Sequence, residues 1–306
     1  QTMSRLLHLP RAKIVIAVAA IAVLSGCASV NLEQNLSSAN AAASSFTDGQ
    51  LTLARDQNER DALRQRASDL LAKPLGQTDA VQLALVNSPS MQAIVAQNWA
   101  DASTAAQSGR IANPILNLER VRLDSETEIG RLLSFGLLDL LTLPTRKGIA
   151  ERRIKQAQLR LSSDVVDQVT QVRQSWVRAV AAQQTLIYTQ QVFASAQASA
   201  ELAKRMQAVG NFNKLDRARQ QAFYADTATQ LASAQHQVTA AREQLVRLLG
   251  LDDGQAQQLR LPERLPALPK EPLSPTDAGR QASKGRLDLQ IAKADYDAAA
   301  RAQGWN

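Results

Sequence analysis

P-L-G-Q-T-D-A at residues 74–80 recurs as P-L-S-P-T-D-A at residues 272–278, and this recurrence decides how the fold is interpreted. The two copies extend without a gap over residues 74–108 and 272–306, with ten identities in 35 positions. The identical pairs are Pro74/Pro272, Leu75/Leu273, Thr78/Thr276, Asp79/Asp277, Ala80/Ala278, Ala84/Ala282, Gln92/Gln290, Ala96/Ala294, Ala100/Ala298 and Ala102/Ala300. The period indicates a structural unit of about 200 residues, of which the chain holds one and a fraction.

The composition favours long helices packed side by side. Aromatic residues are only 4% of the 306 residues, while alanine, glutamine, leucine, arginine and serine dominate. The formal net charge is +7, but arginine and lysine are spread among acidic residues along helical stretches. A nucleic-acid-binding surface needs clustered cations interleaved with aromatic residues. We therefore expect a mainly α protein that does not bind nucleic acid.

The first 27 residues have the pattern of a secretory signal. Basic residues precede a short apolar run, Ile14–Leu24, and the sequence Leu-Ser-Gly-Cys ends at Cys27. The run is too short to span a bilayer. The cysteine resembles the lipobox of bacterial lipoproteins, which implies a signal peptide over residues 1–26, cleavage between Gly26 and Cys27, and acylation of Cys27. Ala28 in the next position implies delivery to the outer membrane of a Gram-negative bacterium. An uncleaved anchor with an incidental cysteine is the alternative.

The segment before the β-hairpin is predicted to contain short elements. Residues 27–73 are expected to form a tether, with a short charged helix within residues 51–72. Thr78 and Asp79 are expected to cap the next helix. Pro89 is unfavourable inside a helix, so we expect a break there and a second helix from about Ser88 to Ile111.

A β-hairpin is expected at about residues 115–141. Residues 115–123 and 131–141 are short, apolar and partly alternating, which favours strands, with a turn over Asp124–Gly130. The second segment is nearly continuous leucine, so periodicity alone leaves strand and helix open there. Two exposed strand edges favour closure into a barrel.

A long helical hairpin is predicted over residues 145–249. Its first arm, residues 145–209, would be ~98 Å long at ~1.5 Å per residue. That arm carries an apolar stripe at helical spacing: Ile154, Leu161, Val165, Val169, Val172, Trp176, Val180 and Ile187. Gly210-Asn211-Phe212-Asn213 interrupts it, and the second arm runs from Lys214 to Leu249 with Gly250 as its C-cap. A proline-rich connection, residues 251–275, leads to the repeat start at 276–306. We expect the helix ending near Ile111 and the second arm to stack end to end beside the long arm.

The sequence contains few residue patterns that are typical of catalytic or metal-binding sites. His8 lies in the signal and His236 lies on a helix face, so no histidine–cysteine cluster remains for a metal. No serine–histidine–aspartate arrangement and no phosphate-binding loop of the G-x-x-x-x-G-K-[ST] type is present. Trp99 and Trp176 sit at helical spacing and are expected to be packing residues. The sequence therefore predicts neither an enzyme nor a cofactor site.

The order of elements, together with the lipobox, resembles the TolC-like outer-membrane efflux proteins, particularly their lipoprotein members. The resemblance covers about residues 74–306. Thr78–Ser108 and Thr276–Gln303 are similar to the alanine-rich helix openings of the family, and Ile111–Leu123 is similar to its first strand entry, A-x-x-x-P-x-L. Val209–Asp216 is similar to its V-G-x-x-x-x-x-D turn between the two long helices.

The resemblance implies a passive conduit. Three protomers, each with two repeats, would form a 12-stranded outer-membrane barrel continuous with a periplasmic α-helical barrel. A periplasmic adaptor protein would grip the helical tips, and an inner-membrane pump would supply the substrate. Val209, Gly210, Leu215 and Asp216 are carried over as adaptor contacts. They are equally compatible with a simple interhelical turn, with Gly210 left-handed and Asp216 capping.

Two departures from the family pattern bear on the interpretation. The Asp124–Gly130 loop is short, and a second strand hairpin and second helical hairpin are missing after Asn306. We therefore expect a C-terminally truncated second repeat, name no gate residue and no exported substrate, and expect no pore from this chain alone. A periplasmic adaptor lipoprotein with a coiled-coil hairpin is one alternative, although residues 28–144 and 251–306 lack the Gly/Val-rich β-domains of such adaptors. A non-functional truncated channel gene is another.

Overall fold

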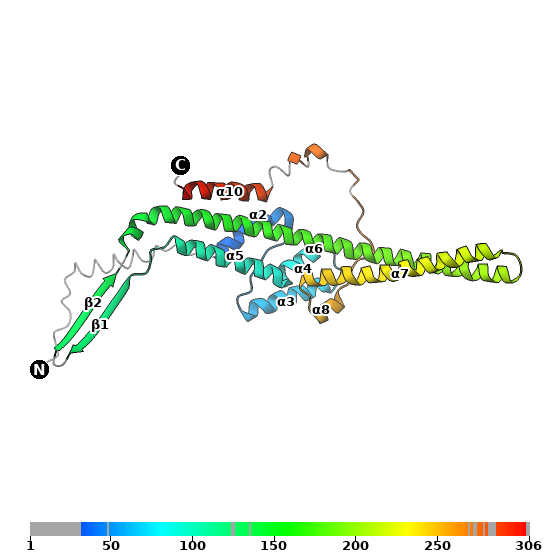
Figure 1. The fold of residues 1–306 in the computed structure, drawn as a ribbon, viewed down its shortest axis with the longest axis horizontal. Coiled ribbons are helices and arrows are strands. Elements are labelled where there is room, and N and C mark those ends of the chain that lie inside the picture. Colours follow the sequence, from blue (N-terminus) through cyan, green and yellow to red (C-terminus); the bar gives the residue numbers. More distant parts are fainter. Residues whose placement is uncertain are drawn as a thin grey trace. The chain divides into compact units, whose positions relative to one another are not determined.

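The computed structural model describes residues 32–47, 49–123, 126–134, 136–268, 270–271, 274–277, 279–280 and 286–303. Within these ranges the elements are mainly helices with one two-stranded antiparallel sheet, as the sequence predicts (Figure 1). In chain order they are α2 (Leu32–Thr47), α3 (Gln57–Leu71), α4 (Gln77–Asn87), α5 (Pro89–Ser108), β1 (Ile115–Leu123), β2 (Glu126–Ser134), α6 (Leu137–Ala208), α7 (Lys214–Leu249), α8 (Asp253–Gln258) and α10 (Leu287–Ala302).

The chain divides into two compact units. One comprises Trp99–Gln158 with the described parts of residues 1–35 and 291–306, and it contains the β-hairpin. The other comprises Leu36–Asn98 and the described parts of residues 159–290, and it contains the main hydrophobic core.

The predicted apolar stripe of the long helix forms part of that core. Residues spaced three or four apart lie on one face of the helix, because a turn takes 3.6 residues, and their side chains are buried in the core. These residues are Leu161, Val165, Val169, Val172, Trp176 and Val180. Ile187 departs from the prediction, because its side chain is 41% exposed. The indole nitrogen of Trp176 donates a hydrogen bond of 2.8 Å to the carbonyl of Leu75, so this buried polar group is satisfied. Trp176 is therefore a packing residue, as expected.

The break at Pro89 is also as predicted. Helix α4 ends at Asn87, Ser88 is extended, and α5 begins with Pro89 in the first helical position, where the missing N–H costs nothing. Helix α7 ends against this break. Gly250 follows it in the left-handed conformation, with its Cα so close to Pro89 that a Cβ would lie 2.3 Å from the proline Cδ. The end of α7 thus meets the start of α5, which is the end-to-end stacking that the sequence suggests.

Helices α6 and α7 form the predicted antiparallel hairpin (Figure 1). The rings of Phe193 and Tyr224 pack with their centroids 5.3 Å apart. Nearer the turn, the guanidinium of Arg217 donates a 2.6 Å hydrogen bond to the side-chain oxygen of Gln207. Helix α7 has the predicted bounds, including its left-handed C-cap at Gly250.

The prediction for residues 131–141 is wrong in its second half. Strand β2 spans Glu126–Ser134, so the predicted turn residues 126–130 are in the strand, and α6 begins at Leu137 with Pro144 inside it. The leucine run has no period that separates strand from helix. The start of the helix is marked by Asp139, whose carboxylate folds back to Gly136 and pairs with Arg146 at 3.1 Å. Because a carboxylate in the first turn stabilises a helix, this acid is the local signal for helix rather than strand.

Three other segments differ from expectation. The predicted tether contains α2, whose small residues at four-residue spacing are buried: Asn35, Ala39, Ala43 and Thr47. The proline-rich connection begins with the short helix α8, closed by a capping box between Asp252 and Gln255. Gly76, not Thr78, is the N-cap residue of α4, while Asp79 lies in its first turn as predicted and pairs with Lys73 at 3.0 Å.

The second repeat start is helical in the expected register. Helix α10 begins at Leu287, which corresponds to Pro89, the first residue of α5, at the offset of 198. The side chain of Gln156 on α6 donates a hydrogen bond to the carboxylate of Asp295 on α10. Several predicted identities lie outside the described residues: Pro272, Leu273, Ala278 and Ala282.

Candidate functional site: the interhelical tip and the β-hairpin

Within the described ranges, the molecule offers surfaces rather than a reaction centre. No group of three or more histidine, cysteine, aspartate or glutamate residues is placed to hold a metal ion there. His236 is exposed on α7. His8, Gly26 and Cys27 lie outside the described residues. None of the helices that the structure describes has the length and apolarity to cross a bilayer.

The tip between α6 and α7 brings together the four residues singled out from the sequence. Gly210 has φ = +81°, a left-handed conformation that favours glycine, and its N–H donates to the carbonyl of Gln207 at 3.1 Å. Val209 and Leu215 are 71% and 61% exposed. The cap differs from the prediction: Asn213 is the N-cap of α7, and its side-chain oxygen accepts from the N–H of Asp216 at 2.7 Å.

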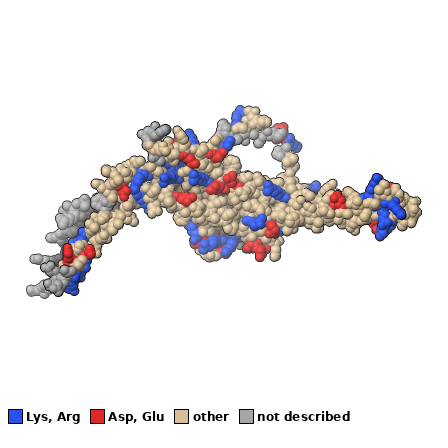
Figure 2. Space-filling view, viewed as in Figure 1, with Lys and Arg blue, Asp and Glu red and all other residues tan. Residues whose placement is uncertain are grey.

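The tip is surrounded by cations. Residues 201–219 contain five basic and two acidic side chains, a net charge of 5 − 2 = +3. The basic ones are all exposed: Lys204, Arg205, Lys214, Arg217 and Arg219 (Figure 2). Arg205 donates a 3.0 Å hydrogen bond to Glu201, and this bond, with the charge of Lys204, lowers the pKa of the Glu201 carboxyl. The tip thus presents a turn with two exposed apolar side chains inside a basic surround.

The β-hairpin is exposed to solvent along its described length. Strands β1 and β2 pair antiparallel in a register that runs from Ile115 opposite Ser134 to Leu123 opposite Glu126. Large apolar side chains on both strands are more than half exposed: Ile115, Leu116, Leu118, Ile129, Leu132 and Leu133. The exposed leucines continue into the first turns of α6, with Leu137, Leu138 and Leu141. Exposed apolar groups in such a concentration are typical of a surface that contacts lipid or another protein.

Alternation along the strands separates the charges of the hairpin by sign, because successive side chains point to opposite faces. The face called here the basic face carries Leu116, Leu118, Arg120, Arg122, Thr127, Ile129, Arg131 and Leu133. The other face, the acidic face, carries Ile115, Asn117, Glu119, Val121, Glu128, Gly130, Leu132 and Ser134, and the terminal pair Leu123–Glu126 of the register belongs to the same face. Each face is therefore partly apolar, and each carries charges of one sign.

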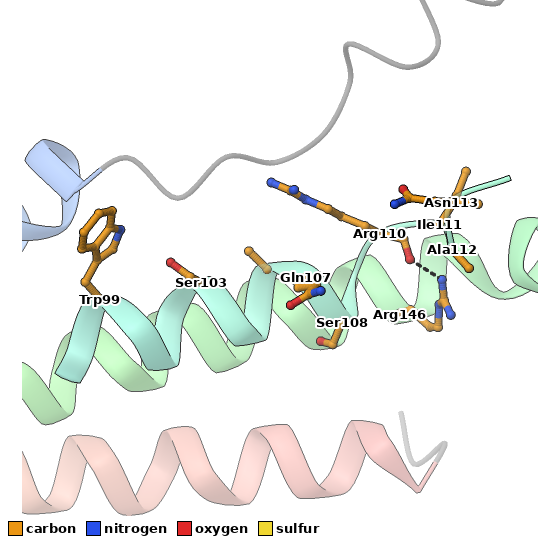
Figure 3. A pocket seen from close by; sticks show the side chains of 10 residues that line it. Trp99, Ser103, Gln107, Ser108, Arg110, Ile111, Ala112, Asn113 and Arg146 are labelled. Carbon is orange, nitrogen blue, oxygen red and sulfur yellow. Dashed lines mark hydrogen bonds between the residues drawn. The ribbon is translucent and has the colours of Figure 1, made fainter. Parts of the chain in front are cut away.

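An open pocket of about 690 Å³ lies between the end of α5, the segment that leads to β1, and the start of α6 (Figure 3). Trp99 and Ser103 line it from α5, and Arg110 and Asn113 line it from the connecting segment. The guanidinium of Arg146 donates to the carbonyl of Arg110 at 2.5 Å. Trp99 is 41% exposed, so the prediction of a packed tryptophan is wrong at this position.

Sequence reasoning missed the role of Arg146. Its guanidinium bridges Asp139 on the same helix and the backbone at Arg110, 36 residues earlier in the chain. Asp139 and Arg146 are seven residues apart, about two helical turns, and this spacing is a sequence signal that could have indicated the pair. This bridge holds the segment entering β1 against the helix that leaves β2.

Comparison with known proteins identifies the fold. No protein-family model matches the sequence, and no curated protein matches it. Among solved structures, a membrane protein from Pseudomonas aeruginosa is similar at 20% identity with a TM-score of 0.56, covering 78% of this chain and 56% of that one. CusC, a protein that forms a transmembrane channel, is similar at 18% identity with a TM-score of 0.56, covering 78% of this chain and 55% of that one. The outer-membrane channel OprN is similar at 16% identity with a TM-score of 0.54, covering 85% and 59%.

The chain thus spans little more than half of the length of these structures. In the part of this chain that the structure describes, the fold consists of long helices and one two-stranded hairpin. The chain has the fold of the TolC-like outer-membrane channels.

Proposed function

We propose that the chain is part of one subunit of an outer-membrane channel, a passive conduit in a tripartite efflux or type I secretion system. One observation carries the proposal: the β-hairpin exposes apolar side chains on both faces, and no further strand pairs with its outer edges among the described residues. An isolated two-stranded hairpin is marginally stable in water. Closure with other hairpins into a membrane barrel pairs the edges and places the apolar side chains of the outward face in lipid.

The dimensions of the hairpin support this proposal. Each strand has nine residues. A tilted transmembrane β-strand needs about 9–11 residues to cross the hydrocarbon layer. The exposed leucines at the start of α6 continue the apolar surface beyond β2, where the membrane boundary is expected.

A single hairpin cannot close a barrel, so the proposal requires assembly. Three subunits with two repeats each would supply six hairpins, or 12 strands, and the long helices would form the wall of a periplasmic tunnel. The repeated helix opening, α5 and α10, supports two repeats in each subunit. We therefore expect the homotrimer to form from subunits that each contain both repeats.

The tip is proposed as the adaptor contact. Val209 and Leu215 expose apolar side chains that a simple helix–helix turn does not require, while Gly210 and Asp216 shape the turn. A periplasmic adaptor that covers these residues would connect the channel to an inner-membrane pump. A photoreactive amino acid at Val209 or Leu215 should cross-link the adaptor in cells, whereas one at the exposed Thr229 of α7 should not. Equal cross-linking of the adaptor from Thr229 would show that the adaptor does not bind specifically at the tip.

A lipid anchor is proposed at Cys27 on the basis of the sequence alone. Cleavage after Gly26 and acylation of Cys27 would attach the protein to outer-membrane lipid. Cells producing Cys27→Ala should incorporate no labelled palmitate into the protein. Incorporation equal to that of the unmodified protein would overturn the anchor without affecting the channel proposal.

Fractionation of cells tests the proposed function as a whole. The complete protein should sediment with outer-membrane vesicles and remain there as a cross-linkable trimer after alkaline washing. Recovery in the soluble periplasmic fraction, or as a monomer in the inner membrane, would contradict the proposal.

A further inference from the structure

The charges of the helical hairpin are concentrated at its tip. Residues 174–241 contain nine charged side chains, and seven of them lie within residues 201–219. The rest of this stretch carries only Arg178 and Asp226. Figure 2 shows the basic side chains gathered at the tip. Charges that only solvate a helix are distributed along its polar face, so this concentration favours a binding role for the tip.

Both acidic side chains of the tip are paired within it. Glu201 accepts a hydrogen bond of 3.0 Å from Arg205, and the carboxylate of Asp216 lies 3.3 Å from the guanidinium of Arg219. Three basic residues remain, and none of them has an acidic side chain within 4 Å in the described part of the chain: Lys204, Lys214 and Arg217. These three account for the net charge of the tip.

The three remaining cations lie close to one another across the turn. The guanidinium of Arg217 on α7 donates a hydrogen bond of 2.6 Å to the side-chain oxygen of Gln207 on α6. Lys204 is three residues before Gln207, and Lys214 is three residues before Arg217. Residues three apart are neighbours on a helix surface, so each lysine lies beside one partner of this hydrogen bond. All three cations are exposed.

Apolar side chains accompany these cations. Val209 and Leu215, which are 71% and 61% exposed, flank the turn. An apolar centre bordered by charged groups is the usual composition of a protein–protein interface. The adaptor contact proposed above supplies the partner, and the present inference rests on it. We propose that the adaptor surface covering the tip is acidic, with carboxylates that pair with Lys204, Lys214 and Arg217.

Other anionic partners fit the tip less well. Proteins that bind single-stranded nucleic acids stack the bases on exposed aromatic rings, and the only aromatic residue within residues 201–219 is the partly buried Phe212. Segments that bind anionic membranes usually carry about four to eight cations, against three without an acidic partner here. A second copy of the tip would bring charges of the same sign. An acidic protein surface satisfies both the cations and the apolar centre.

A carbodiimide tests the pairing directly, because it couples an amine to a carboxylate only where the two groups touch. The reagent activates the carboxylate, the lysine amine attacks it, and an amide forms with the net loss of one water. The reagent is added to cells that produce the complete protein. Mass spectrometry should recover peptides in which Lys204 or Lys214 is joined to an aspartate or glutamate of the adaptor. A photoreactive amino acid at Val209 identifies the adaptor and measures the contact independently.

Two sets of variants separate charge from chemistry. Lys204→Arg combined with Lys214→Arg keeps the charges and removes the amines, so it should abolish the carbodiimide product and preserve the photo-cross-link from Val209. Replacing Lys204, Lys214 and Arg217 together by glutamine should weaken the photo-cross-link about tenfold, a factor of about two for each exposed ion pair. Lys155→Gln, at an exposed lysine of α6 outside the tip, is the control and should leave the photo-cross-link unchanged.

The outcomes separate this inference from the proposed function. The acidic partner is overturned, and the tip contact kept, if the adaptor cross-links equally well from Val209 in the triple glutamine variant. Failure of both lysines to couple to any carboxylate of a cross-linked adaptor would have the same meaning. A photo-cross-link from Val209 to phospholipid alone, or to no other molecule, would show that no adaptor binds the tip, and both proposals would fail.

Discussion

The side-chain amide nitrogen of Asn87 donates hydrogen bonds to the carbonyl oxygens of Leu249 and Gly250, at 3.1 Å and 2.8 Å. These bonds join the end of α4 to the end of α7, 162 and 163 residues apart in the chain. They satisfy carbonyls that the end of an α-helix leaves without intrahelical partners. The junction fixes where α7 stops and α5 begins, so it sets the register of the helical layer.

Gly250→Ala should destabilise the protein more than Gly210→Ala. Both glycines are left-handed, with φ of +67° and +81°, and an alanine in that region costs ~1–2 kcal/mol. A Cβ at Gly250 would also meet Pro89 and Ser88, which adds ~1–3 kcal/mol of overpacking, whereas nothing lies within 4 Å of a Cβ at Gly210. Urea denaturation followed by circular dichroism measures both losses. Equal losses of stability in the two variants would mean that Pro89 and Ser88 shift to make room for the Cβ at position 250 without destabilising the protein.

Asn87→Ala should lower the free energy of unfolding by ~1–3 kcal/mol, because partly buried carbonyls at the end of α7 lose their donor. The side chain of Gln255 also bonds Asn87, at 3.3 Å. A double-mutant cycle with Gln255→Ala should therefore give a non-zero coupling energy. Additive effects would show that the two side chains act independently.

Trp176→Phe should cost ~1–3 kcal/mol of stability, since the carbonyl of Leu75 loses its buried hydrogen bond while most of the ring remains. Trp99→Phe is the matched control, because Trp99 is 41% exposed against 2% for Trp176, and should change stability by less than ~0.5 kcal/mol. Thermal unfolding of the two variants makes the comparison. A larger effect at Trp99 would contradict the assignment of the core.

Asn213→Ala should fray the start of α7 and cost ~1 kcal/mol, the usual contribution of an N-cap. Amide hydrogen exchange should accelerate at Asp216, whose N–H bonds the cap, and remain unchanged in the middle of the helix. The neighbouring exposed residue provides the control: Asn211→Ala should leave exchange at Asp216 unchanged.

Arg205→Ala should return the pKa of the Glu201 carboxyl towards its usual value, because the hydrogen bond from Arg205 is the main cause of the lowered pKa. A carboxyl with a lowered folded-state pKa contributes stability above its unfolded pKa and loses it as the pH falls through the folded value. The ion pair is therefore complete at neutral pH and is lost only in acid. An NMR titration of the Glu201 side chain, with and without Arg205, checks the shift. An unchanged pKa in the variant would rule out Arg205 as its cause.

The sequence predicts the elements whose pattern is regular and local. The helical stripe from Leu161 to Val180, the break at Pro89 and the bounds of α7 follow from periodicity and from proline and glycine signals. The leucine run after β2 could not be assigned in this way, because a continuous apolar run has neither period. There the carboxylate of Asp139 and its pairing with Arg146 favour the helix, and Arg146 also donates to the carbonyl of Arg110, a tertiary contact that no local pattern predicts.

The candidate surfaces were predictable to different degrees. The glycine and the flanking helices predict the tip residues, but the N-cap is Asn213 and not the predicted Asp216, since either residue type can cap. The charge separation of the hairpin depends on the pairing register, which shifts every side chain to the other face if it slips by one residue. The sequence does not predict helix α2, because alanine and serine give no hydrophobic contrast, although buried small residues recur there at every fourth position.

Electron cryomicroscopy of the complete protein in lipid nanodiscs tests the channel assignment most directly. We expect β1 and β2 to lie within the disc, with their outer edges hydrogen-bonded to strands of other hairpins in a closed barrel of three subunits. A hairpin outside the disc, or one inside it with unpaired outer edges, would show that the chain is not part of such a channel.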